Sequence, residues 1–378
     1  MNILICPLDW GLGHAARCVP VIKELQRLGY CVIIGADKSP LAFLQQEFPE
    51  LPTVIIPGYE VTYGEKGNSF KLFCESLHFY QSIKKEHQLI EKIIEENNID
   101  IIISDNRYGL WSKKVKSMII THQLFVKTPV GSSFAHKRIE KLLYNFDEFW
   151  IPDFENEPNL SGDLSHQKTI KFPHRFIGPL SRFSPKQFVI SSVFEERKNV
   201  SRSQQIEEYD IIAIISGPEP QRTIFENLIV EQLKNNQLKA VVVRGLPNIN
   251  VIANEVKQSA QNDKIAASDT LPRNDGNITV FNHLPTEKLY DYLQKSKVVV
   301  ARSGYSTIMD LVALGKKAIL IPTPGQTEQE YLANYHFEQG NFYMQKQSEL
   351  DIQKGVIEVE QFSATINNEY KLKLDFLG

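Results

Sequence analysis

The chain has 378 residues, of which 42% are hydrophobic and 23% charged, the balance of a globular protein rather than a disordered or fibrous one. A single hydrophobic core stops growing near roughly 250 residues, so this length predicts two domains. The net charge of −3 excludes an overall basic field that would collect nucleic acid or anionic lipid. We therefore expect no nucleic-acid partner, and any membrane contact has to be local.

The cysteines and the first residues of the sequence indicate the cellular compartment of the protein. The four cysteines lie in the first fifth of the chain without C-x-x-C spacing, which indicates reduced packing thiols. The sequence opens on "NILIC" without a basic leader or cleavage site, and no apolar run reaches the ~18 residues of a spanning helix. We expect a cytoplasmic protein.

The first half of the chain alternates short apolar runs with helical stretches. Runs that are apolar on both faces and separated by helices are typical of a parallel sheet covered on both sides. The pattern predicts a Rossmann-like doubly wound domain over residues 1–175. The predicted strands are residues 2–6, 31–36, 52–57, 100–104 and 117–122.

The segment "DWGLGHAAR" (9–17) follows the first predicted strand. Pro20 fits best in the first turn of a helix, so we expect the helix to begin near residue 16 or 17. His14 then lies on a loop where open α/β sheets bind ligands, as a candidate base or hydrogen-bond donor. Gly13 lets the backbone approach a ligand closely. Turn geometry alone is the alternative, and G-x-G-H falls short of the full dinucleotide pattern.

The second half of the chain repeats the alternation after a segment rich in proline and glycine. It predicts a second Rossmann-like domain over residues 176–345, facing the first across a cleft that is the default ligand site. Residues 247–277 are polar and aperiodic, and we expect a disordered surface insertion there. The tail, 346–378, could return to the first domain. The predicted strands are residues 210–216, 239–245, 278–284, 297–303 and 317–324.

Residues 301–334 carry the most informative pattern. Ser303 and Gly304 form a tight turn after a strand, and Ser306 or Thr307 can cap the next helix, whose free N–H groups would bind phosphates. Asp310, expected within about the first turn, could accept from ribose hydroxyls or only complement the helix dipole.

A polar loop and helix start come next along the chain. Gln329 and Glu330 follow the loop after the next strand and suit a ligand rich in hydroxyls.

With these residues in place, the chain resembles the GT-B glycosyltransferases. Residues 301–334 are similar to the nucleotide-sugar half of the N-acetylglucosaminyltransferase that completes peptidoglycan lipid II and of the plant galactolipid synthases. "GLGHAAR" resembles the glycine-rich first loop of that family. The resemblance covers most of the chain apart from the insertion and tail, and implies two Rossmann-like doubly wound domains facing across a cleft.

The resemblance also implies a donor site. The helix after the R-S-G turn receives the diphosphate, an acidic residue matching Asp310 holds the ribose, and a polar pair matching Gln329 and Glu330 reads the sugar. The family's next Asn is displaced here to Asn334, which leaves the sugar open. The wall near 281–284 resembles the uracil site, with His283 expected to be structural. The remaining donor-binding candidates are Gly13, Ser216, Gly217, Arg222, Phe281, His283, Leu284, Arg302, Ser303, Gly304, Tyr305, Ser306 and Thr307.

The implied reaction is inverting transfer of a hexose or N-acetylhexosamine from a UDP-sugar to a lipid or glycan acceptor in the cell envelope. The helix start with Arg302 or Arg222 would stabilise the leaving diphosphate, without metal or cofactor, since no D-x-D motif is present. His14 or Asp105 would deprotonate the acceptor, with His122 as a third candidate.

Two other functions remain open at this stage. A nucleotide-sugar hydrolase of nonulosonate synthesis shares the G-x-G-H-x-x-R pattern, and a non-catalytic nucleotide-sugar-binding protein shares the fold. A basic patch over 111–118 and 136–146 is a candidate for peripheral contact with the inner face of the membrane. An ordinary solvent-exposed helix face would have the same residue pattern.

Overall fold

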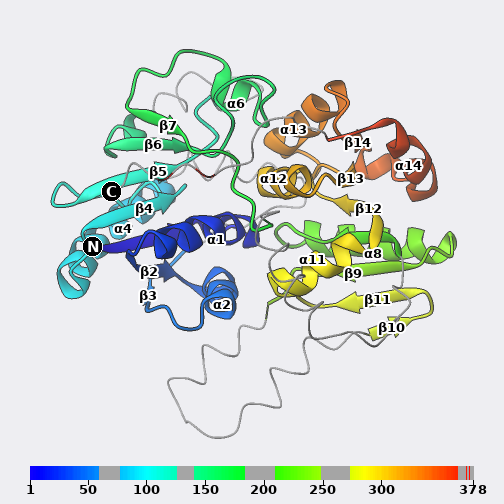
Figure 1. Ribbon diagram of the computed structural model, residues 1–378, viewed down its shortest axis with the longest axis horizontal. Coiled ribbons are helices and arrows are strands. Elements are labelled where there is room, and N and C mark those ends of the chain that lie inside the picture. The colour runs from blue at the N-terminus through cyan, green and yellow to red at the C-terminus, as the bar shows by residue number, and fades with distance from the viewer. Residues whose placement is uncertain are drawn as a thin grey trace, which may run out of the picture.

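The computed structural model describes residues 1–58, 77–125, 140–183, 209–247 and 273–364, together with Leu372 and Leu374. Within these residues the chain forms two sheets of seven strands each, set side by side with helices around them (Figure 1). The prediction of two Rossmann-like doubly wound domains is confirmed. No helix within the described stretches is both long and apolar enough to span a bilayer.

The first sheet is parallel throughout, in the order β3-β2-β1-β4-β5-β6-β7. Sequence periodicity identified the first five strands in chain order and missed the last two. The strands are β1 (Asn2–Pro7), β2 (Cys31–Ala36), β3 (Thr53–Ile55), β4 (Ile101–Asp105), β5 (Lys116–Ile120), β6 (Glu148–Ile151) and β7 (His174–Phe176). The helices are α1 (Leu12–Arg27), α2 (Lys38–Glu47), α4 (Leu77–Asn97) and α6 (Asp163–His166).

Alternation along the strands explains why both faces of this sheet are covered. Ile3 and Ile5 of β1 pack into a cluster with residues of α1 and α2, whereas Leu4 packs into a second cluster with residues of α4. Successive side chains of a strand point to opposite faces, so a run apolar at every position requires a helix on each side.

The second sheet has the order β10-β11-β9-β8-β12-β13-β14, parallel except for the β10–β11 pair. Its strands are β8 (Tyr209–Ile214), β9 (Ala240–Val243), β10 (Arg273–Asp275), β11 (Ile278–Phe281), β12 (Ser296–Ala301), β13 (Lys317–Leu320) and β14 (Tyr343–Met344). The helices are α8 (Gln221–Asn235), α11 (Thr286–Gln294), α12 (Tyr305–Leu314), α13 (Thr327–Glu338) and α14 (Ile352–Glu358), with the short 3₁₀ turns η1 (Gln347–Glu349) and η2 (Val359–Gln361).

The structure corrects the predicted insertion and describes part of the tail. The last residues of the 247–277 segment are ordered, because β10 pairs antiparallel with β11 around a turn at Gly276; residues 248–272 lie outside the described residues. In the tail, α14 packs on α8, and Ile352 joins the cluster that contains Phe225. Leu374 is buried in the large cluster that also contains residues of both domains. The rest of the tail beyond residue 364, apart from Leu372, lies outside the described residues.

Helix α1 begins earlier than the sequence predicted. It starts at Leu12, with Gly11 as N-cap at φ 87°, so the expected start near residue 16 is wrong. Pro20 lies inside the helix, where its missing N–H leaves the carbonyl of Ala16 without its helical donor. His14 therefore lies in the first helical turn rather than on a loop.

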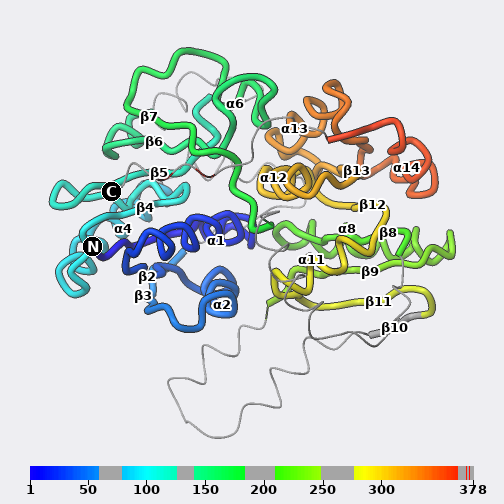
Figure 2. The backbone as a smooth tube through the Cα atoms, in the orientation of Figure 1, coloured from blue at the N-terminus to red at the C-terminus, as the bar shows by residue number. Residues whose placement is uncertain are grey.

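The two domains meet along one continuous apolar cluster that draws residues from both sheets. Helices α1 and α12 contact each other at the centre of the molecule (Figure 2). The domains are therefore in contact in this structure.

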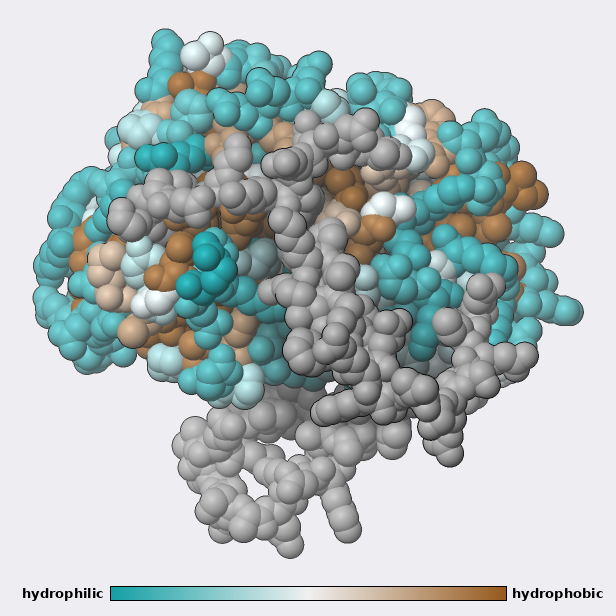
Figure 3. Space-filling view, in the orientation of Figure 1, coloured by the Kyte–Doolittle hydropathy of each residue, from teal (hydrophilic) through white to brown (hydrophobic). Residues whose placement is uncertain are grey.

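On the face seen in Figure 3, hydrophilic residues cover most of the described surface, and apolar residues gather at the margin of the second domain near α14, where Ile357 is 67% exposed.

Gly35 of β2 tests the close packing of the first sheet. A Cβ at this position would lie 2.6 Å from Ile56 Cδ1 and 2.8 Å from Cys6 Sγ. We expect Gly35→Ala to lower the free energy of unfolding by about 1–3 kcal/mol, because core overpacking forces neighbours off their rotamers. Urea unfolding measures the change. The control Cys31→Ala, at the exposed start of the same strand, should stay within about 0.5 kcal/mol of the wild type, and equal losses in both variants would contradict the packing argument.

Candidate functional site

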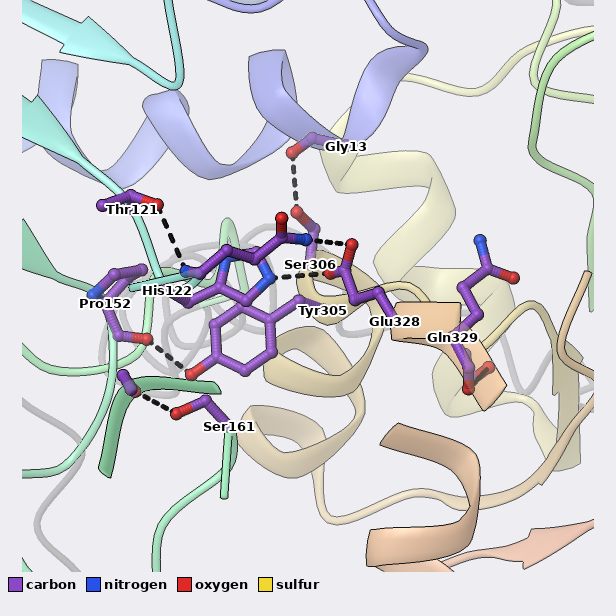
Figure 4. Close-up of polar contacts among 12 residues, drawn as sticks. Gly13, Thr121, His122, Pro152, Ser161, Tyr305, Ser306, Glu328 and Gln329 are labelled. Atoms are coloured by element: carbon purple, nitrogen blue, oxygen red, sulfur yellow. Dashed lines mark hydrogen bonds and ion pairs between the residues drawn. The ribbon is translucent and has the colours of Figure 1, made fainter. Parts of the chain in front are cut away.

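The amino ends of α1 and α12 meet at the boundary between the two domains. Ser306 Oγ donates to the carbonyl oxygen of Gly13 at 2.9 Å (Figure 4). A Cβ on Gly13 would lie 3.3 Å from that hydroxyl, tighter than most carbon contacts. Glycine at position 13 is thus explained by the close approach of the second domain.

Asp105 is a fully buried carboxylate at the end of β4. It accepts from Arg17 Nε at 2.9 and 2.8 Å, from Arg17 Nη2, and from His14 Nδ1 at 3.1 Å. Burial opposes its charge, but Arg17 and His14 outweigh burial and lower the pKa of Asp105 to about 2. A carboxylate ionised at neutral pH and shared by two donors suits orientation of His14 better than proton abstraction.

His14 keeps one nitrogen available. Because the carboxylate of Asp105 can only accept, Nδ1 of His14 carries the hydrogen and Nε2 carries the lone pair. Nε2 has no hydrogen-bond partner among the described residues, and the side chain is 17% exposed. Burial, and then the charge of Arg17, lower the pKa of His14 despite the opposing effect of Asp105. The ring is therefore neutral at pH 7 and able to accept a proton.

His122, the third candidate base, has both nitrogens engaged. Its Nδ1 lies 3.3 Å from Arg17 Nη1 and its Nε2 lies 2.7 Å from Glu328 Oε1. Its ring stacks on Tyr305, with centroids 4.0 Å apart and planes within 10° (Figure 4). His122 lacks a free lone pair for an acceptor hydroxyl, so we exclude it as the base in this arrangement.

The start of α12 differs from the predicted cap. Gly304 is the N-cap and no side-chain hydrogen bond caps the helix, so the expected capping by Ser306 or Thr307 is wrong. Ser303 Oγ donates to the carbonyl of Gln329, and Tyr305 Oη donates to that of Pro152. The first intrahelical bond runs from Ile308 N to Gly304 O, which leaves the amides of residues 305–307 ahead of it as anion-binding donors.

The two arginines expected at the diphosphate are held elsewhere. Arg302 is 1% exposed, stacks 4.0 Å above the Phe225 ring and donates to the carbonyls of Ile321, Pro322 and Gln221. Arg222 is bound by the carboxylates of Glu219 and Glu226 at 2.6 and 2.8 Å. Both guanidinium groups are thus committed to packing within the second domain, and their predicted contact with a diphosphate is not supported.

Asp310 lies on the second turn of α12, one turn later than predicted. It accepts from Ser181 Oγ at 2.6 Å and lies 3.6 Å from Arg182 Nε, both on the segment that connects the domains. Burial raises its pKa, against the charge of Arg182. A ribose at Asp310 would share this carboxylate with the connecting segment.

Gln329 and Glu330 keep part of their side chains available. Gln329 Oε1 accepts from the amide of Thr323 at 2.9 Å, and Glu330 Oε1 accepts from the amide of Gly325 at 2.9 Å. Nε2 of Gln329 and Oε2 of Glu330 have no partner in the described part of the chain. Asn334, by contrast, donates to the carbonyl of Glu330 within its own helix.

The remaining donor-site candidates lie in loops and at a strand end. Ser216 and Gly217 follow β8, with Gly217 at φ 112°. Phe281 ends β11 and, like Leu284, is buried. His283 packs edge-on against Phe43 of α2, 5.7 Å between centroids, and burial, aided by Arg182, lowers its pKa to about 4. It is therefore neutral at pH 7.

The sequence argument assigned no role to Arg17 and Glu328, which lie at this site, or to Asp9 after β1. Arg17 is three positions after His14 on α1, within the same turn of the motif. Glu328 directly precedes Gln329 on α13. Asp9, just after β1, has its pKa raised to about 6 by burial, against Lys38 and Arg107. Asp9 and Arg17 stand inside the quoted segment 9–17, and Arg17 is the arginine of the G-x-G-H-x-x-R pattern. For Glu328, its position next to Gln329 was the only sequence signal.

Comparisons with known proteins agree with this geometry. Residues 212–373 match the glycosyltransferase family 28 C-terminal domain. The chain is 22% identical to an uncharacterized glycosyltransferase of Methanosarcina acetivorans, over 90% of this chain and 84% of the relative. It is 21% identical to the UDP-N-acetylglucosamine--N-acetylmuramyl-(pentapeptide) pyrophosphoryl-undecaprenol N-acetylglucosamine transferase of Bacillus subtilis, over 96% and 90%. The calicheamicin glycosyltransferase CalG4 shares the fold at TM-score 0.57 and 12% identity, covering 95% of this chain and 89% of its own.

The contacts of Arg302 make it a stability residue in our interpretation. Replacement by Met should lower the free energy of unfolding by about 2–4 kcal/mol, because several buried carbonyls lose their donor. Urea unfolding measures this loss, and calorimetry with UDP should show an affinity within about threefold of the wild type, less than the ~1.4 kcal/mol that a tenfold change represents. Lys317→Met, which removes the surface ion pair with Glu360, should cost less than about 1 kcal/mol. A stable Arg302→Met variant that no longer binds UDP would restore Arg302 to the donor site.

Proposed function

We propose that the chain, a glycosyltransferase of the GT-B fold, transfers a hexose or N-acetylhexosamine from a UDP-sugar to a lipid or glycan acceptor, with inversion at the anomeric carbon. The observation that carries this proposal is the placement of His14, whose free Nε2 belongs to the first domain, beside the start of α12 in the second. The printed name of the Bacillus subtilis relative, a UDP-N-acetylglucosamine-dependent transferase, supports the choice of donor.

We assign the diphosphate to the first turn of α12. The amides of residues 305–307 precede the first intrahelical bond, and the positive end of the helix dipole favours a dianion there. The departing diphosphate gains negative charge in the transition state, which fixed amide dipoles stabilise without reorganising. On this account the reaction needs no metal ion.

We assign the acceptor proton to His14 Nε2. As the acceptor oxygen attacks the anomeric carbon, His14 takes its proton, and the sugar–phosphate bond breaks on the opposite face. Asp105 acts as a positioning residue, because its carboxylate holds the Nδ1–H tautomer and stabilises the imidazolium that forms. Attack opposite to the leaving group is what makes the reaction inverting.

The rest of the donor is assigned to the second domain. Asp310 would accept from the ribose hydroxyls, and the free amide of Gln329 and free oxygen of Glu330 would read the sugar hydroxyls. The backbone near residues 281–284 would hold the uracil, with Ser216 and Gly217 beside the diphosphate.

We place the reaction at the inner face of the membrane when the acceptor is a lipid. The patch proposed for this contact includes Trp111, with Lys113 Nζ 5.4 Å from its ring centroid. Lys137 and Arg138 of this patch lie outside the described residues. The undecaprenol in the name of the Bacillus subtilis relative supports a lipid-linked acceptor.

A nucleotide screen tests the donor assignment. Thermal unfolding in UDP, GDP, dTDP and CMP should show the largest stabilisation with UDP, about 2.7 kcal/mol at a hundredfold excess over its Kd. Asp310→Ala should remove at least ~1 kcal/mol of that stabilisation, since hydrogen bonds to charged groups contribute about that much or more. If UDP stabilises neither protein, the donor assignment fails.

Replacement of His14 tests the base. His14→Ala should lower kcat for transfer by about 10²–10⁴-fold while UDP binding persists, because general base catalysis contributes that much. Since the pKa of His14 is lowered and only the neutral ring accepts a proton, the midpoint of the acid limb of kcat/KM should lie below pH 6.5. Release of free sugar from UDP-sugar without acceptor, at the rate of transfer, would instead indicate a hydrolase.

A further inference from the structure

Glu328 of the second domain binds two residues of the first. It lies in the first turn of α13, where Oε1 is 2.7 Å from His122 Nε2 and Oε2 accepts from the side-chain amide of Gln123. Figure 4 shows its carboxylate directed at His122, while the neighbouring Gln329 extends away from it. The carboxylate is thus turned toward the first domain rather than toward the proposed sugar site.

The partners of His122 determine which nitrogen carries its hydrogen. Arg17 Nη1 lies 3.3 Å from His122 Nδ1, and a guanidinium can only donate, so Nδ1 accepts. Nε2 then carries the hydrogen and donates it to Glu328. The stacked ring of Tyr305 fixes the plane in which both bonds are made. His122 therefore links a carboxylate of one domain to a guanidinium of the other.

The opposite edge of Arg17 continues this connection to His14. Nε and Nη2 of Arg17 donate to Asp105, which in turn accepts from His14 Nδ1. One guanidinium charge is therefore shared between a carboxylate of its own domain and, through His122, a carboxylate of the other. Arg17 is 2% exposed, so water does little to screen its charge.

The groups around His14 shift its pKa in opposite directions. Burial and then Arg17 lower the pKa of His14, whereas Asp105 raises it. Burial opposes the charge of Glu328, but His122, Arg17 and His14 together lower the pKa of Glu328, which is therefore ionised. The thiol of Cys18, 3.8 Å from Asp105, has its pKa raised by burial and stays neutral. Glu328 is thus a second negative charge that offsets Arg17.

We propose that Glu328 is a positioning residue for the transfer reaction, which offsets the buried charge of Arg17 through His122 and so lets His14 accept a proton readily only while the two domains are closed. This inference rests on the proposed role of His14 as the base. If the two domains were apart, only the carboxylate of Asp105 would offset the charge of Arg17 beside His14, because Glu328 would have moved away with the second domain. Proton acceptance would then be coupled to the closed state in which donor and acceptor lie together.

Uncharged contacts already join α13 to the first domain, so closure by itself does not require this carboxylate. Tyr335 Oη donates to the carbonyl of Asn159 at 3.2 Å, and His336 Nε2 donates to that of Leu160 at 2.9 Å. Both bonds lie about two turns further along the same helix as Glu328. These two hydrogen bonds hold the domains together but bring no negative charge near Arg17, which Glu328 alone of these three residues of α13 does.

The test compares pH profiles of kcat/KM and kcat for the full-length enzyme with UDP-sugar and acceptor. Glu328→Gln keeps the shape and the acceptor oxygen but removes the charge. A lost negative charge disfavours the imidazolium, so the acid limb should move about half a unit to lower pH. The plateau kcat should fall by up to about threefold, the factor that half a pKa unit represents, with donor KM within about twofold. Glu338→Gln, at the exposed end of the same helix, should leave all three values unchanged.

Two further measurements keep the test decisive if Glu328→Gln folds poorly. Glu328→Asp retains the charge on a shorter side chain and should shift the limb less than Glu328→Gln. A histidine NMR titration should assign a lower pKa to His14 in either variant than in the wild type. The inference is overturned if neither the acid limb of the pH profile nor the pKa of His14 changes. It is also overturned if donor KM rises without a shift of the acid limb, because Glu328 would then be a sugar-binding residue. Full activity of His14→Ala would instead overturn the proposed function.

Discussion

The ion pair between Arg17 and Asp105 is the interaction on which the rest of the site depends. Both side chains are withdrawn from water, which is costly for two charges unless their remaining hydrogen-bonding positions are filled. They are filled by His14 on the carboxylate and by His122 on the guanidinium. The requirement to satisfy one buried pair therefore fixes the tautomers of two histidines. It also makes the loss of either partner far more damaging than the loss of a surface pair.

The two domains also contact each other in the region around this ion pair. Helix α1 brings Arg17 and His14 to the boundary, and Gly13 allows α12 to approach so closely that Ser306 binds its carbonyl. Helix α13 adds Glu328 from the other side. Three helix starts thus converge where an anionic donor would be bound. The amides at the start of α12 and the dipole of that helix supply positive potential, while Arg17, Arg222 and Arg302 are paired or packed internally.

The fold was largely predictable from the sequence, and the site only in part. Strands apolar on both faces and the R-S-G turn before α12 are local signals, and both domains were located from them. The start of α1 was placed too late, because the argument gave Pro20 more weight than Gly11, whose φ of 87° ends the loop. Strands β6 and β7 were missed because their sequences, EFWI and HRF, lack the run of β-branched residues that marked the other strands of this sheet.

By itself the sequence determined the two α/β domains, the glycines that precede His14, and a helix shortly after the turn at Ser303 and Gly304, because periodicity and turn residues act over a few neighbouring positions. The residues at which α1 and α12 begin were not determined in this way. Only the tertiary structure decided which polar groups face one another. Asp105 pairs with a residue 88 positions away, and Glu328 with one 206 positions away. Whether a carboxylate or an arginine is buried and paired or left free for a ligand depends on such distant partners, since burial and neighbouring charge set its protonation and its remaining hydrogen bonds.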